Sequence, residues 1–237
     1  MGTQSAALLS NPVHTVRNGT DITPFSHSGG CADILWRACP AILQHCRRPP
    51  TATRKRAFMF LSKAAYYADF VVYPVLLLLL ASTLAWGTPW GDAAWFGAGA
   101  AGVAAYSLLE YVLHRFVLHH LPPFSRMHAL HHQHPAALVG TPTVYTAAIG
   151  GGVLLAAWWA AGWNLGCGFT FGVMLGYFWY GLVHHAVHHW SARKGSYLHG
   201  LKRRHNVHHY APQACNYGVT TSLWDRVFGS ERCRPAD

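Results

Sequence analysis

The sequence predicts an all-α integral membrane protein with four membrane-spanning helices arranged as two hairpins. Hydrophobic residues make up 51% of its 237 residues and charged residues only 11%, an unusual balance for a soluble domain of this length. Four apolar windows of roughly membrane-spanning length contain no lysine or arginine. Histidines gather at or shortly after the ends of these windows, which indicates a metal site at the membrane surface.

The apolar windows run over Phe70–Trp86, Ala93–Leu113, Val144–Ala161 and Leu165–Val183. Glu110 is the one acidic residue inside them. The cluster Gly162, Asn164, Gly166 and Gly168 predicts a tight turn between the last two spans. Buried core helices of a soluble protein are the alternative, and the absence of lysine and arginine from the windows argues against them.

The distribution of charge predicts the orientation of the spans. All 18 lysines and arginines lie in residues 1–63, 115–126 or 193–234, and the short connections 87–92 and 162–168 have none. The positive-inside rule therefore places both termini and the histidine groups on the cytoplasmic side. The net charge of +10 is explained by attraction to anionic lipid headgroups. Nucleic acid is not expected as a partner, because no recognised binding module accompanies the charge.

Outside the membrane domain, expected at residues 63–230, the sequence predicts little regular structure. Residues 1–62 are basic, lack an apolar period and are too polar for a secretory signal, so we expect a poorly ordered region there. Met59 precedes the first span and is a possible natural start, while residues 231–237 form a short tail. The six cysteines show no C-x-x-C spacing and are expected to be free thiols, at Cys31, Cys39, Cys46, Cys167, Cys215 and Cys233.

Four groups of histidines carry the metal hypothesis. Two groups repeat the pattern H-x-x-H-H, in which positions i, i+3 and i+4 of a helix share one face, so the three imidazoles of each are expected to converge on one point. The other two are pairs, four and five residues apart. The ten residues are His114/His119, His128/His131/His132, His184/His188 and His205/His208/His209. One ion takes about four to six ligands, so ten ligands predict two neighbouring ions.

Two features of these groups remain open from the residues alone. His114 and His119 are about 140° apart on a regular α-helix, so the helix is expected to end or bulge between them. His120, His134, His185 and His189 are neighbours that compete as ligands, and His185/His189 has the same spacing as His184/His188.

The chemistry of the ligand set favours iron. The groups contain no Asp, no Glu and no H-E-x-x-H motif, so a zinc peptidase is disfavoured. A zinc pair would suit hydrolysis, but no G-x-S-x-G elbow accompanies it. Iron can accept electrons, bind dioxygen and remove hydrogen from an unactivated C–H bond. A centre facing a membrane-embedded bundle indicates that this bond belongs to a lipid.

The sequence resembles the fatty acid hydroxylase and sterol desaturase superfamily of membrane di-iron enzymes, and within it the fatty acid 2-hydroxylase branch. The resemblance covers roughly Tyr67 to Ser230. It is carried by HRFVLH at 114–119, HALHHQHP at 128–135, HHAVH at 184–188, KGSYLHGLKRRHNVHHY at 194–210 and GVTTSLWDRVFG at 218–229. The fixed offset in this family from the histidine pair to K-G-S-Y-L favours His184/His188 over their neighbours.

The resemblance implies a cytosolic helical cap above the four spans and a dinuclear centre ligated by the ten histidines. It implies two Fe2+ ions, which zinc can replace, with O2 as co-substrate and a membrane lipid as substrate. The string SHSGG at 26–30 lacks the proline of a cytochrome b5 haem motif, so the electrons are expected from a separate protein, a cytochrome b5-like protein, a ferredoxin or a reductase. Oxidation or desaturation of a sterol, carotenoid or other lipid is the alternative function, and metal transport or buffering the remote one.

Overall fold

The computed structural model describes residues 60–86 and 89–232, and these fold into helices without a strand. The expectations for residues 1–59, including the start at Met59, and for the end of the tail lie outside the described residues. The helices are α2 (Lys63–Tyr67), α3 (Asp69–Ser82), η3 (Thr83–Trp86), α4 (Pro89–Val112), η4 (Leu113–Leu118), α5 (Phe124–Gln133), α6 (Thr143–Ala161), α7 (Trp163–His189), α8 (Tyr197–Tyr210) and α9 (Leu223–Val227).

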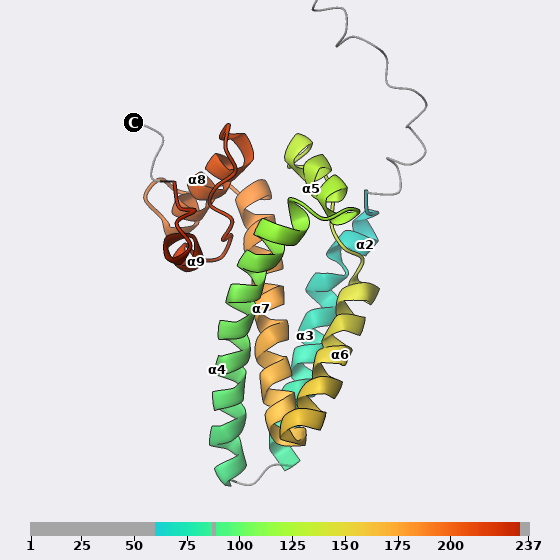
Figure 1. Cartoon of the computed structure of the whole chain (residues 1–237). Helices are drawn as coiled ribbons and strands as arrows, with labels where there is room; N and C mark the ends of the chain where they lie inside the picture. Colours follow the sequence, from blue (N-terminus) through green and yellow to red (C-terminus); the bar gives the residue numbers. More distant parts are fainter. Residues whose placement is uncertain (1–59, 87–88, 233–237) are drawn as a thin grey trace, which may run out of the picture. The chain divides into compact units, whose positions relative to one another are not determined.

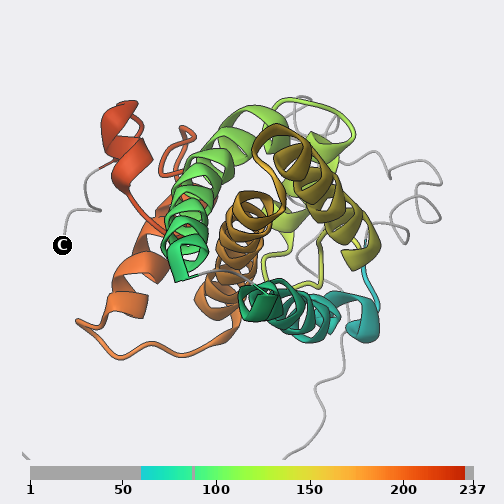
Figure 2. The ribbon, with the colours of Figure 1, turned by 90° about the horizontal axis from the view of Figure 1, so that it is seen from below.

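Four helical segments are long and apolar enough to cross a membrane: Lys63–Ala85, Asp92–Leu118, Thr143–Ala161 and Trp163–His189. They run up and down in chain order, α3 then α4 and α6 then α7 (Figure 1). α6 and α7 pack together as a hairpin, whereas α3 and α4 each pack on α7. α7 packs against each of the other three long helices, which surround it when the bundle is seen from below (Figure 2). The all-α fold with four spans is therefore confirmed.

Glycines allow α4 and α7 to touch through their backbones. A Cβ added at Gly172 of α7 would lie 2.0 Å from the carbonyl oxygen of Gly99 on α4, and one added at Gly102 would lie 2.2 Å from the carbonyl oxygen of Phe169. Side chains of any size would push these helices apart. This close approach fixes the two helices that carry histidine pairs at their ends.

The turn between α6 and α7 is tighter than the glycine cluster predicts. Gly162 alone makes it, with a φ of 81°. Gly166 and Gly168 lie inside α7, where an added Cβ would meet the backbones of Trp158 and Trp95 at 2.7 and 2.4 Å. These two glycines therefore serve helix packing and not the turn.

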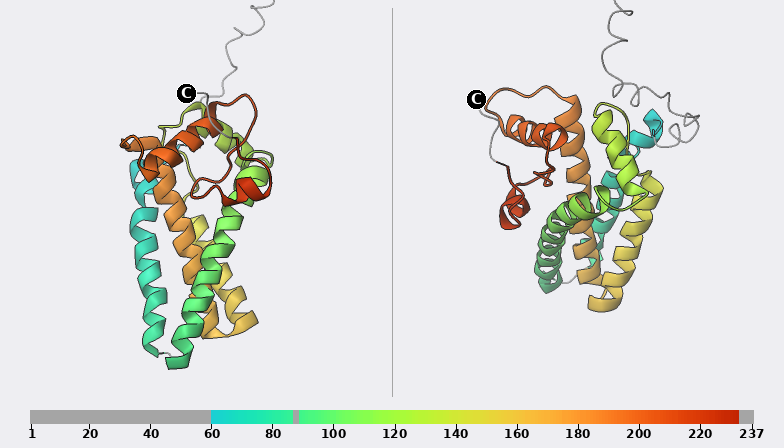
Figure 3. Two further views of the ribbon diagram at one scale, coloured as in Figure 1. Left: turned by 90° about the vertical axis from the view of Figure 1, so that its left-hand side faces the viewer. Right: turned by 45° about the horizontal axis from the view of Figure 1, so that its top comes forward.

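A helical cap lies at one end of the bundle, formed by η4, α5, α8 and α9 (Figure 3). Ser196 caps α8, its side chain accepting a hydrogen bond from the backbone N–H of His199 at 3.2 Å. α9 docks on α4, where the indole N–H of Trp224 donates to Ser107 Oγ at 3.1 Å. The phenyl ring of Phe228 stacks on Tyr111, with ring centroids 5.2 Å apart. The two free cysteines among the described residues, Cys167 and Cys215, are buried.

Candidate metal centre

A π-helix resolves the five-residue spacing of His114 and His119. Residues Leu113–Leu118 continue α4 as the π-helix η4. Hydrogen bonds in a π-helix join residues five apart, so side chains at i and i+5 share a face that an α-helix would separate. The two imidazole rings lie with their centroids 5.3 Å apart. The expected bulge between the two histidines is confirmed.

The two H-x-x-H-H triplets do not converge as expected. α5 contributes His128 and His132 to one group of imidazoles and His131 to another. α8 contributes His208 to the first group and His205 to the second. The expectation that each triplet meets at one point is wrong, because each helix lies between two groups. The two histidines four residues apart stay in contact, His128 with His132 on α5 and His205 with His209 on α8. The third histidine of each triplet, His131 or His208, points about 100° away from its immediate neighbour in the chain and so reaches the other group.

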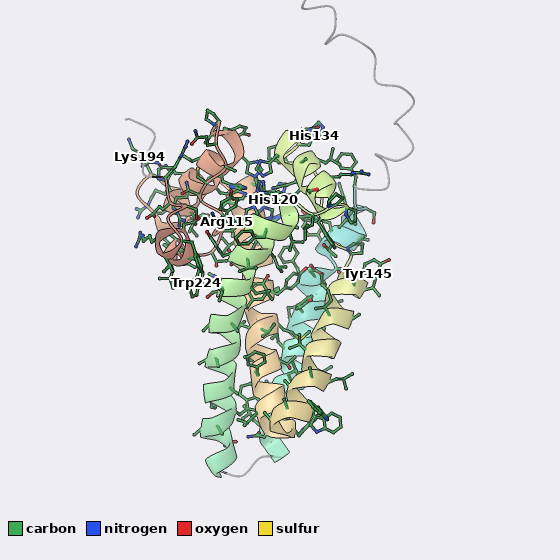
Figure 4. All side chains as sticks on the ribbon, in the orientation of Figure 1. Arg115, His120, His134, Tyr145, Lys194 and Trp224 are labelled. Atoms are coloured by element: carbon green, nitrogen blue, oxygen red, sulfur yellow. The ribbon has the colours of Figure 1, made fainter. Side chains whose placement is uncertain are left out.

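In the first group the Nε2 atoms of five histidines, His114, His119, His128, His132 and His208, lie close together. His128 Nε2 lies 3.0 Å from that of His114, 3.1 Å from that of His119 and 3.0 Å from that of His132. His208 Nε2 lies 3.2 Å from that of His119 and 3.1 Å from that of His132. These atoms come from η4, α5 and α8, and nitrogen atoms gather at this end of the bundle in Figure 4.

The second group contains His131, His184, His188 and His205. His184 Nε2 lies 3.2 Å from His131 Nε2, and His205 Nε2 lies 2.8 Å from His188 Nε2. His209 lies beside both groups: its Nε2 is 3.1 Å from that of His205, and its ring stacks on His132 at 4.2 Å between centroids. The structure thus brings all ten predicted histidines together, nine of them in two groups.

Burial keeps these imidazoles neutral. His128, His131, His205 and His208 are each at most 8% exposed. Removal from water, and then neighbouring imidazoles, lower the pKa of His131 to about 3. Removal from water is also the leading cause that lowers the pKa of His208 to about 3, against the opposing effect of its hydrogen bond to Cys215. The pKa of His128 and of His205 is also lowered, first by burial. Neutral imidazoles hold their lone pairs free for a cation at physiological pH.

Two backbone carbonyls fix the tautomers in the first group. His208 Nδ1 donates to the carbonyl oxygen of Cys215 at 2.7 Å, and His114 Nδ1 donates to that of Tyr217. Because each neutral ring carries one hydrogen, the Nε2 of His114 and of His208 holds a lone pair. These lone pairs point at the Nε2 atoms of neighbouring rings. A cation held between them would accept the lone pairs of all these rings at once.

The spacing of the nitrogen atoms also fits a metal. A metal–nitrogen distance of about 2.1 Å separates neighbouring ligand atoms by about 3.0 Å at right angles and about 3.4 Å at tetrahedral angles. The contacts between Nε2 atoms in the first group run from 3.0 to 3.2 Å. Both donor chemistry and spacing therefore suit a transition-metal ion in the first group, and the second group offers the same donors.

The four competing histidines lie outside both groups. His185 Nδ1 contacts the hydroxyl of Tyr66 at 3.1 Å on the side of α7 that faces α2 and α3. His120 contacts the carbonyl oxygen of Arg115, and His134 lies against Phe60. Figure 4 labels His120 and His134 at the cap. His184/His188, and not His185/His189, face the other histidines.

An open pocket of about 370 Å3 gives access to the first group. It is lined by residues of η4, its C-terminal end and α5, including the three histidines His119, His128 and His132. The sequence did not predict this opening.

The sequence also did not predict the role of the loop between α8 and α9, whose residues Cys215 and Tyr217 supply the two carbonyls. Glu110 stood out as an acid in an apolar span, and Asp225 lay within a quoted motif, but only the fold shows that both contact this loop.

Comparisons with known proteins agree with the fold and identify the family. The family model described as fatty acid hydroxylase matches residues 99–230. A dihydroceramide fatty acyl 2-hydroxylase of Arabidopsis thaliana, FAH2, is 34% identical over 112 residues, which cover 44% of each protein. The fatty acid 2-hydroxylase of Homo sapiens is 46% identical over 57 residues, 24% of this chain and 15% of the human protein.

A solved structure shares the fold. Full-length scs7p, of which only the hydroxylase domain is visible, superposes with a TM-score of 0.60 at 25% identity, covering 71% of this chain and 67% of that one. The matches to the curated relatives span less than half of their length. The family model covers more than half of this chain, and the relatives carry the name of the 2-hydroxylase branch that the motifs resemble. This chain belongs to the fatty acid hydroxylase family.

Proposed function

We propose that this protein is a membrane enzyme that hydroxylates the acyl chain of a lipid, in the manner of a fatty acid 2-hydroxylase, at a centre of two iron ions. The observation that carries the proposal is the pair of histidine groups at one end of four membrane-spanning segments. The names of the relatives, fatty acid and dihydroceramide fatty acyl 2-hydroxylases, support an acyl substrate.

Ten residues are proposed to hold the ions. The first ion would be held by His114, His119, His128, His132 and His208, and the second by His131, His184, His188 and His205, with His209 beside both. Iron would supply the one-electron redox chemistry with O2 that hydroxylation of an unactivated C–H bond requires, and zinc in its place would not. The histidines keep their lone pairs free, and the surrounding fold buries five of them, His114, His128, His131, His205 and His208.

The substrate is proposed to approach from the bilayer. The histidine groups lie at the ends of η4 and α7, so an acyl chain among the spans is already close to them. Tyr180, one turn before His184 on α7, stacks on that imidazole with ring centroids 5.5 Å apart and nearly parallel planes. Its ring thus covers one face of His184.

Electrons and O2 are proposed to reach the centre from the cytoplasm. Basic side chains are exposed on the cap, among them Arg126, Arg193, Lys194 and Arg203. A cytoplasmic cap satisfies the positive-inside rule, and its positive charge would attract an acidic electron-donor protein. The pocket beside His119, His128 and His132 supports access from this side.

Lipid mass spectrometry tests the proposal directly. Cells expressing the protein with a suitable electron donor should contain an acyl species heavier by one oxygen atom, with the hydroxyl at carbon 2 in the fragment spectrum. The variant His208→Ala/His209→Ala should lack it, whereas His199→Ala, on the same helix but outside both groups, should retain it. Loss of two hydrogens without gain of oxygen would instead assign a desaturase.

A further inference from the structure

Residues 215–220, between α8 and α9, form a buried loop beside the first histidine group. The two carbonyls that accept hydrogen bonds from His208 and His114 belong to its residues Cys215 and Tyr217. The intervening Asn216 is 1% exposed and adopts a φ of 53°, so the backbone path is specific. Since both acceptors are backbone atoms, the orientation of these two imidazoles depends on whatever holds the loop in place.

Asp225 on α9 holds the loop from one side. This carboxylate is fully buried, with Oδ1 accepting the backbone N–H of Tyr217 at 2.8 Å and Oδ2 that of Gly218 at 2.9 Å. Ser230 Oγ donates to Oδ1 and the guanidinium of Arg204 to Oδ2, at 2.8 and 3.0 Å. Each oxygen therefore accepts two hydrogen bonds, which leaves the side chain a single position.

Glu110 on α4 holds the loop from the other side. Its Oε1 accepts the backbone N–H groups of Val219 and Thr220 at 2.7 and 2.9 Å, and its Oε2 accepts the Thr220 hydroxyl at 2.6 Å. Glu110 lies four residues before His114 in the chain. The same helical segment thus carries a proposed ligand and a carboxylate that holds the loop behind that ligand, two and three residues after Tyr217.

The second group has a different environment. Among the described residues, the Nδ1 atom of His205 in this group is buried without a hydrogen-bond partner, as is that of His209 beside both groups. The hydrogen bonds of Glu110 and Asp225 reach the loop, Arg204 and Ser230, and within the part of the chain that the structure describes none joins them to an imidazole of the second group. Partners behind a ligating histidine set its orientation and basicity, so the two groups differ in what fixes their ligands.

From this asymmetry we propose that Glu110 and Asp225 are positioning residues for one metal site only, the first group, and act on it through the 215–220 loop. The inference rests on the proposed dinuclear centre. It predicts that substitution of either carboxylate separates the two sites, weakening one ion and sparing the other. Substitution of a residue that merely stabilised the fold would weaken metal binding at both sites.

The experiment measures Co2+ binding to the full-length protein in lipid nanodiscs, by metal content, chelator competition and visible absorption. His132→Ala and His131→Ala provide reference spectra for loss of the first and second sites. Asp225→Asn places an amide N–H against the N–H of Tyr217 or Gly218, and Glu110→Gln does the same at Thr220 or Val219. We expect each to weaken the first site about 10- to 100-fold, with the second site unchanged.

Arg226→Gln is the matched control. Arg226 follows Asp225 on α9 but pairs with Glu231 at the surface, where its side chain is 67% exposed. This variant should bind both ions as the wild type does. Thr220→Val removes one hydrogen bond from Glu110 and changes no charge, so it should weaken the first site by a smaller factor even if the carboxylate variants do not fold.

Two results would overturn the inference: equal weakening of both sites in Asp225→Asn, Glu110→Gln or Thr220→Val, or wild-type affinity at both sites in all three. Failure of the proposed function gives a different pattern. A wild type that binds two ions but modifies no lipid refutes the hydroxylase and leaves the positioning role standing. A wild type that binds fewer than two ions refutes the dinuclear centre and this inference together.

Discussion

Substitution of Gly172 by alanine tests whether backbone contact between α4 and α7 sets the geometry of the bundle. The added Cβ would lie 2.0 Å from the carbonyl oxygen of Gly99, 2.8 Å from its carbonyl carbon and 2.9 Å from the backbone nitrogen of Val103. Ordinary contact requires the helices to separate locally by about 1.4 Å. Overpacking of this kind typically destabilises a protein by about 1–3 kcal/mol.

Gly181→Ala, on the same helix, is the control, because an added Cβ there would have open space around it, with no neighbouring atom within 4 Å. Both variants gain about 1 kcal/mol of helix propensity, so the difference between their free energies of unfolding isolates the clash. The assay is equilibrium unfolding in mixed micelles, followed by tryptophan fluorescence. We expect Gly172→Ala to be the less stable by about 1–3 kcal/mol. Equal stability of the two variants would refute the argument from backbone contact.

Three further predictions concern the histidines. Chelation should abolish hydroxylation, and Fe2+ with a reductant should restore it in the product assay where Zn2+ does not; recovery with Zn2+ would exclude redox chemistry. In elemental analysis, His185→Ala should keep the full metal content, because its imidazole faces Tyr66 and lies outside both groups, and loss of an ion would contradict this placement. Burial lowers the pKa of His119 to about 4 and that of His131 to about 3, from 6.5. Below about pH 6.5 the unfolded chain binds protons that the folded, metal-free protein does not, so its free energy of unfolding should fall steadily from about pH 7.5 to pH 5. A flat profile in denaturant titrations would show that these imidazoles are not buried in neutral form.

The spans could be predicted from the sequence because length and apolarity are local properties. Val144–Ala161 as an expected window differs from α6 by a single residue. The bulge between His114 and His119 was also predictable, since two ligands five residues apart cannot share a face of an α-helix. His184/His188 were preferred because of their fixed distance in the chain from the K-G-S-Y-L motif in the family that the sequence resembles. In the structure these two residues lie on the face of α7 that meets the other histidines.

The division of the histidines into two groups could not be predicted in the same way. Whether His131 meets His132 or His184 depends on where α5 lies relative to α7, and no pattern within the triplet encodes that position. The role of the Tyr217 carbonyl could not be predicted either, because a backbone atom has no sequence signature. Glu110 was visible as an exception in an apolar window, but its partners lie more than a hundred residues away.

The π-helix at residues 113–118 has a consequence for transplanting this site. An extra residue in one turn cannot be introduced by substitution, so no exchange of side chains on a regular helix would reproduce the pair His114 and His119. A designer who grafted only the ten imidazoles onto a straight four-helix scaffold would turn one of this pair away from the first group. The graft has to copy the backbone of the six-residue segment, and the number of residues in that turn is as much part of the ligand set as the histidines are.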